Sequence, residues 1–426
     1  MLIPFSPDYR GEGRYNVVAT GAIFFDKSAR GFGEKCQEIR TILRIATSYS
    51  EALRRKKAID MTSLERQAAE TRIECRASDH FADWMANLPG TLAVTTYQAG
   101  KLAFLGWRGQ QLSLLMRQFD KPMGLAVDPL GSGKLALATR NEITLFANAN
   151  LLAPEFLLNQ PSQYDALFLP RVTYHTADLN VHDVGWGHDG VWFVNSRFSC
   201  LSRLSSDYSF VPCWQPPFIS ELVPEDRCHL NGLAMFEGRP KYVTALGECD
   251  KVGGWRENKA AGGILLDVES REILVRGLSM PHSPRWHQGR LYLLNSGTGE
   301  LLAFDPVTFK IDSICTLPAY LRGLCLIDNW AVVGLCQIRE THIFGGLPVQ
   351  QKFKQLLCGL GVVDLGTGNL VATFQFTSGC TEIYDIQFLP GMRTPNILNL
   401  TQEPTRQAFT APDFSYWLRP ENMLPT

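Results

Sequence analysis

Two histidines, an asparagine, an arginine and a tyrosine occur at one recurring place in the sequence, where they could bind and transform a small polar molecule. Each begins a pentapeptide that continues with a small or short polar residue, an apolar residue, any residue and a large apolar residue. Five copies begin at His182, Asn231, His282, Arg322 and Tyr384, and a sixth begins at Met123. Either histidine could act as a general acid or base. The planar guanidinium of Arg322 suits a carboxylate or a phosphate.

The same positions raise the question of a metal ion. His182, Asn231 and His282 come from three neighbouring repeats and could share one, because imidazole binds Zn, Fe, Cu and Ni. No carboxylate occupies a first position, so the sequence assigns no residue as a metal ligand. A divalent transition metal is one cofactor that the pattern allows, and it indicates no other.

Other side chains are expected at the same place. Two aspartates follow first positions directly, one histidine lies two residues before Asn231, and two asparagines end second strands. Two long connections, 247–263 and 337–358, also reach it, and such loops usually act as lids or binding loops. If the protein catalyses a reaction, either of the two histidines, or Tyr384 beside Asp385, could transfer the protons. The further ligand-binding candidates, beside Arg322 and Asn231, are Asp183, Asn195, His229, Trp255, Arg256 and Asn295.

The residues after each pentapeptide predict the elements that position these side chains. After Trp286, a turn at 287–289 leads to an apolar run at 290–296, and further runs follow at 300–305 and 310–314. The copy that begins at His182 has the same order, and both copies carry Asn-Ser at the end of the second run. Such runs separated by turn residues are typical of antiparallel strands. Six copies of a four-stranded unit predict an all-β fold, a six-bladed β-propeller.

The two ends of the repeat region complete one another. Residues 91–104 and 111–118 correspond to the second, third and fourth strands of a unit without a first strand, and 384–388 is a first strand without successors. We therefore predict that one C-terminal strand closes the ring by pairing with three N-terminal strands. The expected domains are a helical or irregular extension over 1–88, with 1–60 as a candidate appendage, the propeller over 89–392 and a tail over 393–426. A short helix is expected from an N-cap at Ser78 through Asn87.

Composition narrows the class of protein. The 426 residues include 41 Lys and Arg and 42 Asp and Glu, giving a net charge of −1, and this neutrality argues against a nucleic-acid partner. No apolar run is long enough to span a membrane, and the N-terminus has no secretory pattern. The 11 cysteines are scattered through apolar runs, as in a reducing compartment. We expect a cytoplasmic protein with a small-molecule ligand, and a protein partner stays open.

Several stretches resemble known families. Residues 122–128 resemble the blade opening of NHL-repeat propellers, and 229–235 look like the matching segment of gluconolactonase and senescence-marker-protein propellers. As a whole, residues 78–400 resemble a bacterial family known only as conserved hypothetical proteins, most clearly at 92–102, 253–259 and 280–284. That resemblance implies a propeller-like domain and no reaction. The lactonase relatives hold a divalent cation with acidic and asparagine side chains, and only Asn231 matches that set, since Met123 replaces an acidic ligand.

The sequence therefore favours a small polar or anionic ligand at one mouth of the propeller channel. Acid–base chemistry by His182, His282, Tyr384 and Asp385 is compatible with this prediction, although whether the protein is an enzyme stays open. Two alternatives remain. One is a platform for protein–protein interaction without catalysis, and the other is a metal-dependent hydrolase similar to the lactonases.

Overall fold

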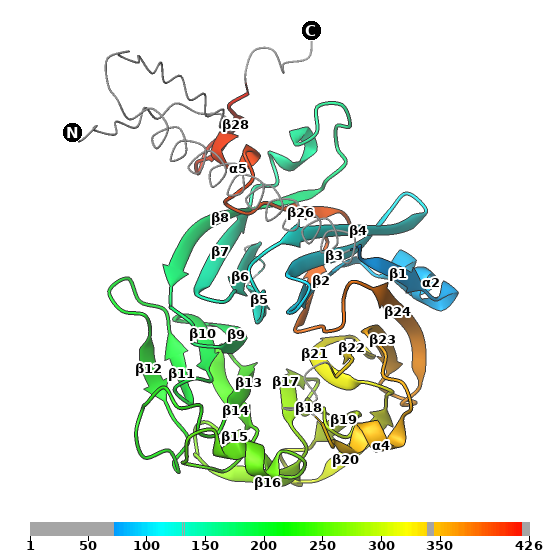
Figure 1. The fold of residues 1–426 in the computed structure, drawn as a ribbon. Coiled ribbons are helices and arrows are strands. Elements are labelled where there is room, and N and C mark those ends of the chain that lie inside the picture. Colours follow the sequence, from blue (N-terminus) through cyan, green and yellow to red (C-terminus); the bar gives the residue numbers. More distant parts are fainter. Residues whose placement is uncertain (1–71, 130, 132, 339–344, 420–426) are drawn as a thin grey trace, which may run out of the picture. The chain divides into compact units, whose positions relative to one another are not determined.

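The computed structural model describes residues 72–129, 131, 133–338 and 345–419, which form a ring of six β-sheets (Figure 1). Each sheet is one blade, so the predicted all-β, six-bladed propeller is confirmed. The helical extension expected before residue 72, including the candidate appendage over 1–60, lies outside the described residues. Residues 339–344 of the second long connection lie outside them as well.

The blades follow one another around the ring, and each is built from four strands that run from the axis outward. Blade 1 contains β25 (Ile386–Pro390), β2 (Gly90–Thr96), β3 (Lys101–Arg108) and β4 (Gln111–Gln118). Blade 2 contains β5 (Leu125–Val127), β6 (Lys134–Ala138), β7 (Glu142–Asn148) and β8 (Ala166–His175). Blade 3 contains β9 (Val181–Gly187), β10 (Gly190–Asn195), β11 (Cys200–Arg203) and β12 (Val211–Trp214).

The other three blades repeat this order. Blade 4 contains β13 (Leu230–Phe236), β14 (Arg239–Ala245), β15 (Gly263–Asp267) and β16 (Ile273–Leu278). Blade 5 contains β17 (Pro281–His287), β18 (Arg290–Asn295), β19 (Glu300–Phe304) and β20 (Ile311–Thr316). Blade 6 contains β21 (Tyr320–Ile327), β22 (Trp330–Cys336), β23 (Gly359–Asp364) and β24 (Leu370–Ser378).

Blade 1 closes the ring in the predicted way. Its innermost strand β25 comes from the C-terminal part of the chain and pairs antiparallel with β2, from Gly90 opposite Pro390 to Val94 opposite Ile386. Two further strands cover outer edges: β1 (Glu74–Ala77) pairs with β24, and β26 (Pro395–Ile397) pairs in parallel with β8. Covering these edges removes unpaired backbone groups that would otherwise invite another chain.

The second position of the pentapeptide explains how the inner strands fit together. It alternates around the ring between a polar residue in blades 1, 3 and 5 and glycine in blades 2, 4 and 6. The polar side chains accept backbone N–H groups of the next blade, as Asp183 does from Leu233 at 2.9 Å. The glycines allow close approach, since a Cβ on Gly232 would lie 2.2 Å from Pro284 Cδ. The pattern "small or short polar" thus reflects two kinds of contact that alternate around the propeller, a hydrogen bond after each odd-numbered blade and close packing after each even-numbered blade.

Apolar side chains fill the spaces between the blades, where Leu, Val, Ala and Phe predominate. The predicted short helix is present as α2 (Asp79–Asn87), capped by Ser78, whose hydroxyl accepts the Phe81 N–H at 3.2 Å. Phe81 and Met85 of this helix are fully buried in the same core as blades 1 and 6.

The remaining described elements are short and lie in connections or in the C-terminal segment. They are the 3-10 helices η1 (Ala153–Glu155) and η2 (Gly254–Asn258), the helices α4 (Pro348–Lys352) and α5 (Pro404–Gln407), and the hairpin strands β27 (Ala408–Thr410) and β28 (Ser415–Trp417). In the described ranges, no helix is long and apolar enough to cross a membrane.

Candidate ligand site at the propeller axis

Six polar side chains lie buried together where the innermost strands begin. The first positions of the pentapeptides supply five of them, and the residue that precedes β13 supplies the sixth. Their exposed fractions lie between 3% and 9%, so the polar groups are largely withdrawn from water. We call this set the axial cluster, and its members are His182, His229, Asn231, His282, Arg322 and Tyr384.

His282 is held by a serine and a backbone carbonyl. Its Nδ1 lies 2.8 Å from the Met280 carbonyl oxygen and 2.9 Å from Ser296 Oγ. The carbonyl can only accept, so Nδ1 carries the proton. Ser296 in turn donates to the Leu321 carbonyl of blade 6 at 2.6 Å. The ring is thereby fixed in one tautomer, with Nε2 as a bare acceptor at the axis.

His182 repeats this arrangement two blades away. Its Nδ1 lies 2.8 Å from the Asn180 carbonyl and 2.7 Å from Ser196 Oγ, and Ser196 donates to the Leu230 carbonyl of blade 4 at 2.5 Å. Asn180 has a positive φ of 54°, and Met280, at the same place in blade 5, has 50°. The same backbone turn therefore presents the accepting carbonyl in both blades.

Burial keeps both of these histidines neutral. It holds the pKa of His182 well below its usual range, and the positive charges of His229 and Arg322 lower it further. Burial likewise holds the pKa of His282 well below its usual range, with Arg322 as the next cause. Both rings therefore offer an unprotonated Nε2 at neutral pH.

His182, His229 and Asp226 form one hydrogen-bonded chain. His229 Nε2 lies 3.1 Å from His182 Nε2, and His229 Nδ1 lies 2.7 Å from Asp226 Oδ1. Because Nδ1 of both rings faces an acceptor, the contact between the two Nε2 atoms requires one further proton. Because His182 Nε2 is unprotonated, His229 donates in this contact, and its Nδ1 faces the Asp226 carboxylate. The proton of this contact is the group in the cluster best suited to acid–base work.

Arg322 carries the other charge of the axial cluster. Its Nε donates to His282 Nε2 at 3.3 Å, and its guanidinium lies 4.7 Å from the centre of the Tyr384 ring. Among the described residues, no carboxylate lies within ion-pair distance of it. Its two terminal nitrogens donate to no described protein acceptor. A buried cation without a carboxylate is costly unless an anion joins it.

Tyr384 presents a second donor without a partner. Its hydroxyl is buried and has no hydrogen-bond partner among the described residues. Burial raises the pKa of Tyr384 well above its usual value, with Arg322 opposing, so the phenol keeps its proton. Its ring lies 5.4 Å from that of Tyr97 and 5.7 Å from that of His182, measured between ring centres.

Asp183 and Asp385, which the sequence suggested as ligand-binding and catalytic residues, instead connect the blades of the propeller. Arg285 bridges them, with NH1 2.8 Å from Asp183 Oδ2 and NH2 3.1 Å from Asp385 Oδ1. Asp385 also accepts the backbone N–H of Leu125 at 2.9 Å. Burial raises the pKa of Asp385 to about 6, and the charge of Arg285 opposes the shift. These carboxylates tie blades 1, 3 and 5 together, and we assign them no role toward a ligand.

Asn195 and Asn295, also proposed as ligand-binding residues, shape turns. Asn195 Oδ1 accepts the Phe198 N–H at 3.1 Å, and Asn295 Oδ1 accepts the Ser279 N–H at 2.6 Å. The serine that follows each asparagine is the residue that reaches the axial cluster. Asn231, by contrast, belongs to the cluster, with Nδ2 3.1 Å from His282 Nε2.

Trp255 and Arg256 lie in the connection between β14 and β15 and meet the cluster through Asp226. Trp255 is 3% exposed, its Nε1 donates to Asp226 Oδ2 at 3.0 Å, and its ring centre lies 4.6 Å from that of His229. Arg256 reaches the same oxygen at 3.4 Å. The connection is therefore ordered and fastened beside the axial cluster, as a lid would be.

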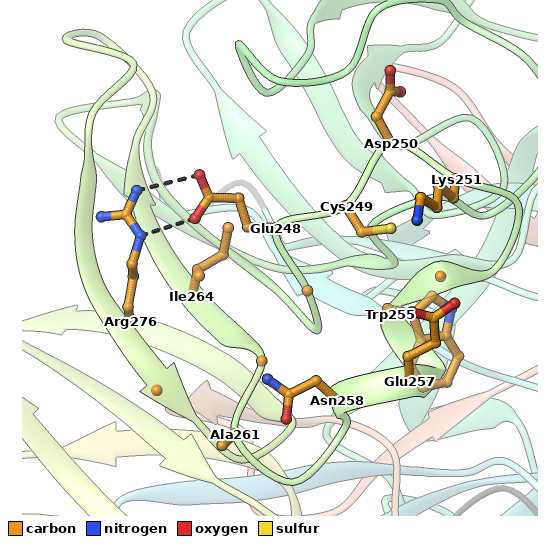
Figure 2. Close-up of a pocket in the computed structure, with 14 residues that line it drawn as sticks. Glu248, Cys249, Asp250, Lys251, Trp255, Glu257, Asn258, Ala261, Ile264 and Arg276 are labelled. Atoms are coloured by element: carbon orange, nitrogen blue, oxygen red, sulfur yellow. Dashed lines mark hydrogen bonds and ion pairs between the residues drawn. The ribbon is translucent and has the colours of Figure 1, made fainter.

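Two pockets border this connection. One, of about 540 Å³, is lined by Asn180, Asp226 and Arg256 among others and adjoins the chain from Asp226 to His182. The other, of about 620 Å³, lies between the connection and β16. Figure 2 shows that the ion pair of Glu248 and Arg276, at 2.8 Å, stands on one side of it and Trp255 on the other.

The part of the chain that the structure describes contains no group of three or more His, Cys, Asp or Glu side chains that could hold a metal ion. His182, Asn231 and His282, the metal candidates from the sequence, instead use their axial atoms for hydrogen bonds to other members of the cluster. We therefore propose no metal centre.

Four residues of this site were not recognised in the sequence. Ser196 and Ser296 had a visible signal, because the Asn-Ser pair recurs at the same place in two blades. Arg285 lies inside a pentapeptide, but at the position where any residue is allowed. Asp226 lies in an irregular segment with a positive φ of 51° and matches no repeat position, so no sequence pattern pointed to it.

Comparison with known proteins gives a family. Residues 79–398 match a protein family that is described as "Domain of unknown function (DUF4915)". The chain belongs to this family. No curated protein matches its sequence.

Two solved structures are similar to this chain at low sequence identity. A chain in a crystal structure of a nidogen/laminin complex shares 12% sequence identity with this chain at a TM-score of 0.45, and the alignment covers 71% of this chain and 98% of that chain. A protein of unknown function from Bacteroides caccae shares 10% identity at a TM-score of 0.44 and covers 71% of this chain and 99% of its own.

Proposed function

We propose that the axial cluster binds a small anionic molecule through Arg322. The supporting observation is that Arg322 is 9% exposed and forms no ion pair with a carboxylate among the described residues. An anion there would accept hydrogen bonds from the two terminal nitrogens of Arg322 and from the unpartnered hydroxyl of Tyr384. Charge-assisted hydrogen bonds of this kind are about twice as strong as neutral ones.

A catalytic role for the same site is the second candidate. It is favoured by the hydrogen bond between the Nε2 atoms of His182 and His229, whose proton lies beside Tyr384. A ligand held by Arg322 would lie close to this proton, so the pair could donate it to the ligand or accept another from it. His182 and Tyr384 are the candidate groups for that step, and Asp226 orients His229.

The test is a thermal-shift screen of anionic and neutral metabolites on the wild-type protein and on two variants. In Arg322→Gln the charge at the axis is lost, while Arg140→Gln removes an exposed arginine that pairs with Asp120 at 3.1 Å. We expect stabilisation by one or more anions that Arg322→Gln abolishes and Arg140→Gln preserves. If no anion stabilises the wild-type protein, or if both variants respond equally, the proposal is wrong. Retention of a protein partner by Arg322→Gln in that case would favour the interaction platform.

A further inference from the structure

We infer that the ligand of the axial cluster carries a single negative charge and presents it as a carboxylate. This inference rests on the proposed function and adds the chemical class of the ligand. It follows from counting the charges that face the site and from the geometry of the donors.

Arg322 and His282 together supply one positive charge. The Nε of an arginine is always a donor, and in this cluster it points at His282 Nε2 from 3.3 Å. His282 Nδ1 already holds its proton toward the Met280 carbonyl. His282 is therefore neutral, and it cannot add a second positive charge without losing the bond from Arg322.

The other titratable members of the cluster add no net charge. His182 is neutral, and the Asp226 carboxylate, with Oδ1 2.7 Å from His229 Nδ1, balances any charge on the His229 imidazole. Arg256 approaches the other oxygen of Asp226, and its side chain is half exposed, so water screens its charge. The histidine chain therefore does not attract a second negative charge on the ligand.

The charges around the cluster make the site less positive still. Arg285 is surrounded by two carboxylates, so that group of three carries one net negative charge. Glu382 is buried close enough to Arg322 to raise the pKa of the guanidinium, although burial of the guanidinium itself opposes this. A dianion such as a phosphate monoester would thus bring more uncompensated charge than a carboxylate into a buried place, where charges interact strongly.

The donors also suit a planar group. The terminal nitrogens of a guanidinium form a flat fork that matches the two oxygens of a carboxylate. The guanidinium carbon of Arg322 lies over the Tyr384 ring, 4.7 Å from its centre, so the fork and the Tyr384 hydroxyl belong to one place in the cluster. The unpartnered hydroxyl of Tyr384 supplies a further donor. One carboxylate would satisfy the two free nitrogens of Arg322.

The experiment compares two matched pairs of probes on the full chain: acetate with inorganic phosphate, and benzoate with phenyl phosphate. Affinities are measured by calorimetric titration above neutral pH, where phosphate monoesters are dianions. We expect each carboxylate to bind at least about tenfold more tightly than its phosphate partner. The Arg322→Gln variant should lose at least about tenfold in carboxylate affinity, and Arg140→Gln should lose none. Arg322→Lys, which keeps the charge without the fork, should fall between wild type and Arg322→Gln.

The possible results are distinguishable. Phosphates that bind as tightly as the carboxylates, and lose affinity in Arg322→Gln, would overturn the carboxylate inference and leave the anion site intact. Binding of neither class, or binding that Arg322→Gln leaves unchanged, would overturn both. Circular dichroism of each variant shows whether a loss of binding reflects a loss of fold.

Discussion

The serine that holds His282 offers a quantitative test of how the axial cluster is built. Ser296→Ala removes two buried hydrogen bonds, one from His282 Nδ1 at 2.9 Å and one to the Leu321 carbonyl at 2.6 Å. The Met280 carbonyl still accepts from Nδ1, so the histidine keeps its tautomer. We therefore expect a loss of stability, while the His282 imidazole keeps one of its two hydrogen bonds through Nδ1.

The magnitude follows from the two bonds. A buried hydrogen bond contributes about 0.5–1.5 kcal/mol net, so Ser296→Ala should lower the free energy of unfolding by about 1–3 kcal/mol. A matched control lies in the connection that leads from β16 into β17, because the Ser279 hydroxyl is also buried and has no hydrogen-bond partner among the described residues. Removing an unpaired polar atom forfeits no hydrogen bond, and Ser279→Ala should change the free energy by about 0.5 kcal/mol or less, or stabilise the protein.

The assay is urea unfolding followed by circular dichroism, with both variants measured beside the wild type. The difference between the two alanine variants is the informative quantity, since both remove one buried serine hydroxyl. Equal destabilisation by the two substitutions would refute the reasoning, because it would mean that the bonds through Ser296 contribute nothing specific.

Three further predictions concern the charges around the axis. The pKa values of His182 and His282 lie below their unfolded value of about 6.5, so the contribution of these residues to stability is complete above that pH and is lost as the pH falls below it. Asp385 has a raised pKa and offsets part of this loss. A free energy of unfolding that stays constant as the pH falls would contradict the assignment. Asp226→Asn removes the charged acceptor of Trp255, so limited proteolysis should cut the β14–β15 connection faster, and unchanged cleavage would show that this bond does not fasten it. Arg285→Met leaves Asp183 and Asp385 without their cation and should cost about 3–5 kcal/mol in urea unfolding, a prediction that a near-neutral result would rule out.

The ring could be predicted from the sequence because its signals are local and repeated. The alternation of a strand and the residues of a turn depend on near neighbours, and six copies made the order of the strands and the closure by β25 recognisable. The strands β1 and β26 escaped prediction because they have four and three residues and belong to no repeat. Each pairs with a strand far away in the sequence, at the edge of a blade.

The axial cluster could be predicted only in part. The first position of the pentapeptide placed His182, His282 and Arg322 together, since equivalent residues of a propeller lie on one ring. The choice between Asn295 and Ser296 could not be made, because adjacent residues at a strand end point in different directions. Which carboxylates pair with arginine, as Asp183 and Asp385 do, depends on contacts across the ring that no local pattern records.

The most direct test of the central claim is a crystal structure of the protein with bound benzoate. The account predicts a planar carboxylate at the axis, with its oxygens within hydrogen-bond distance of the terminal nitrogens of Arg322 and the hydroxyl of Tyr384. A structure in which benzoate lies elsewhere, and in which Arg322 is paired with a carboxylate of the protein, would contradict it.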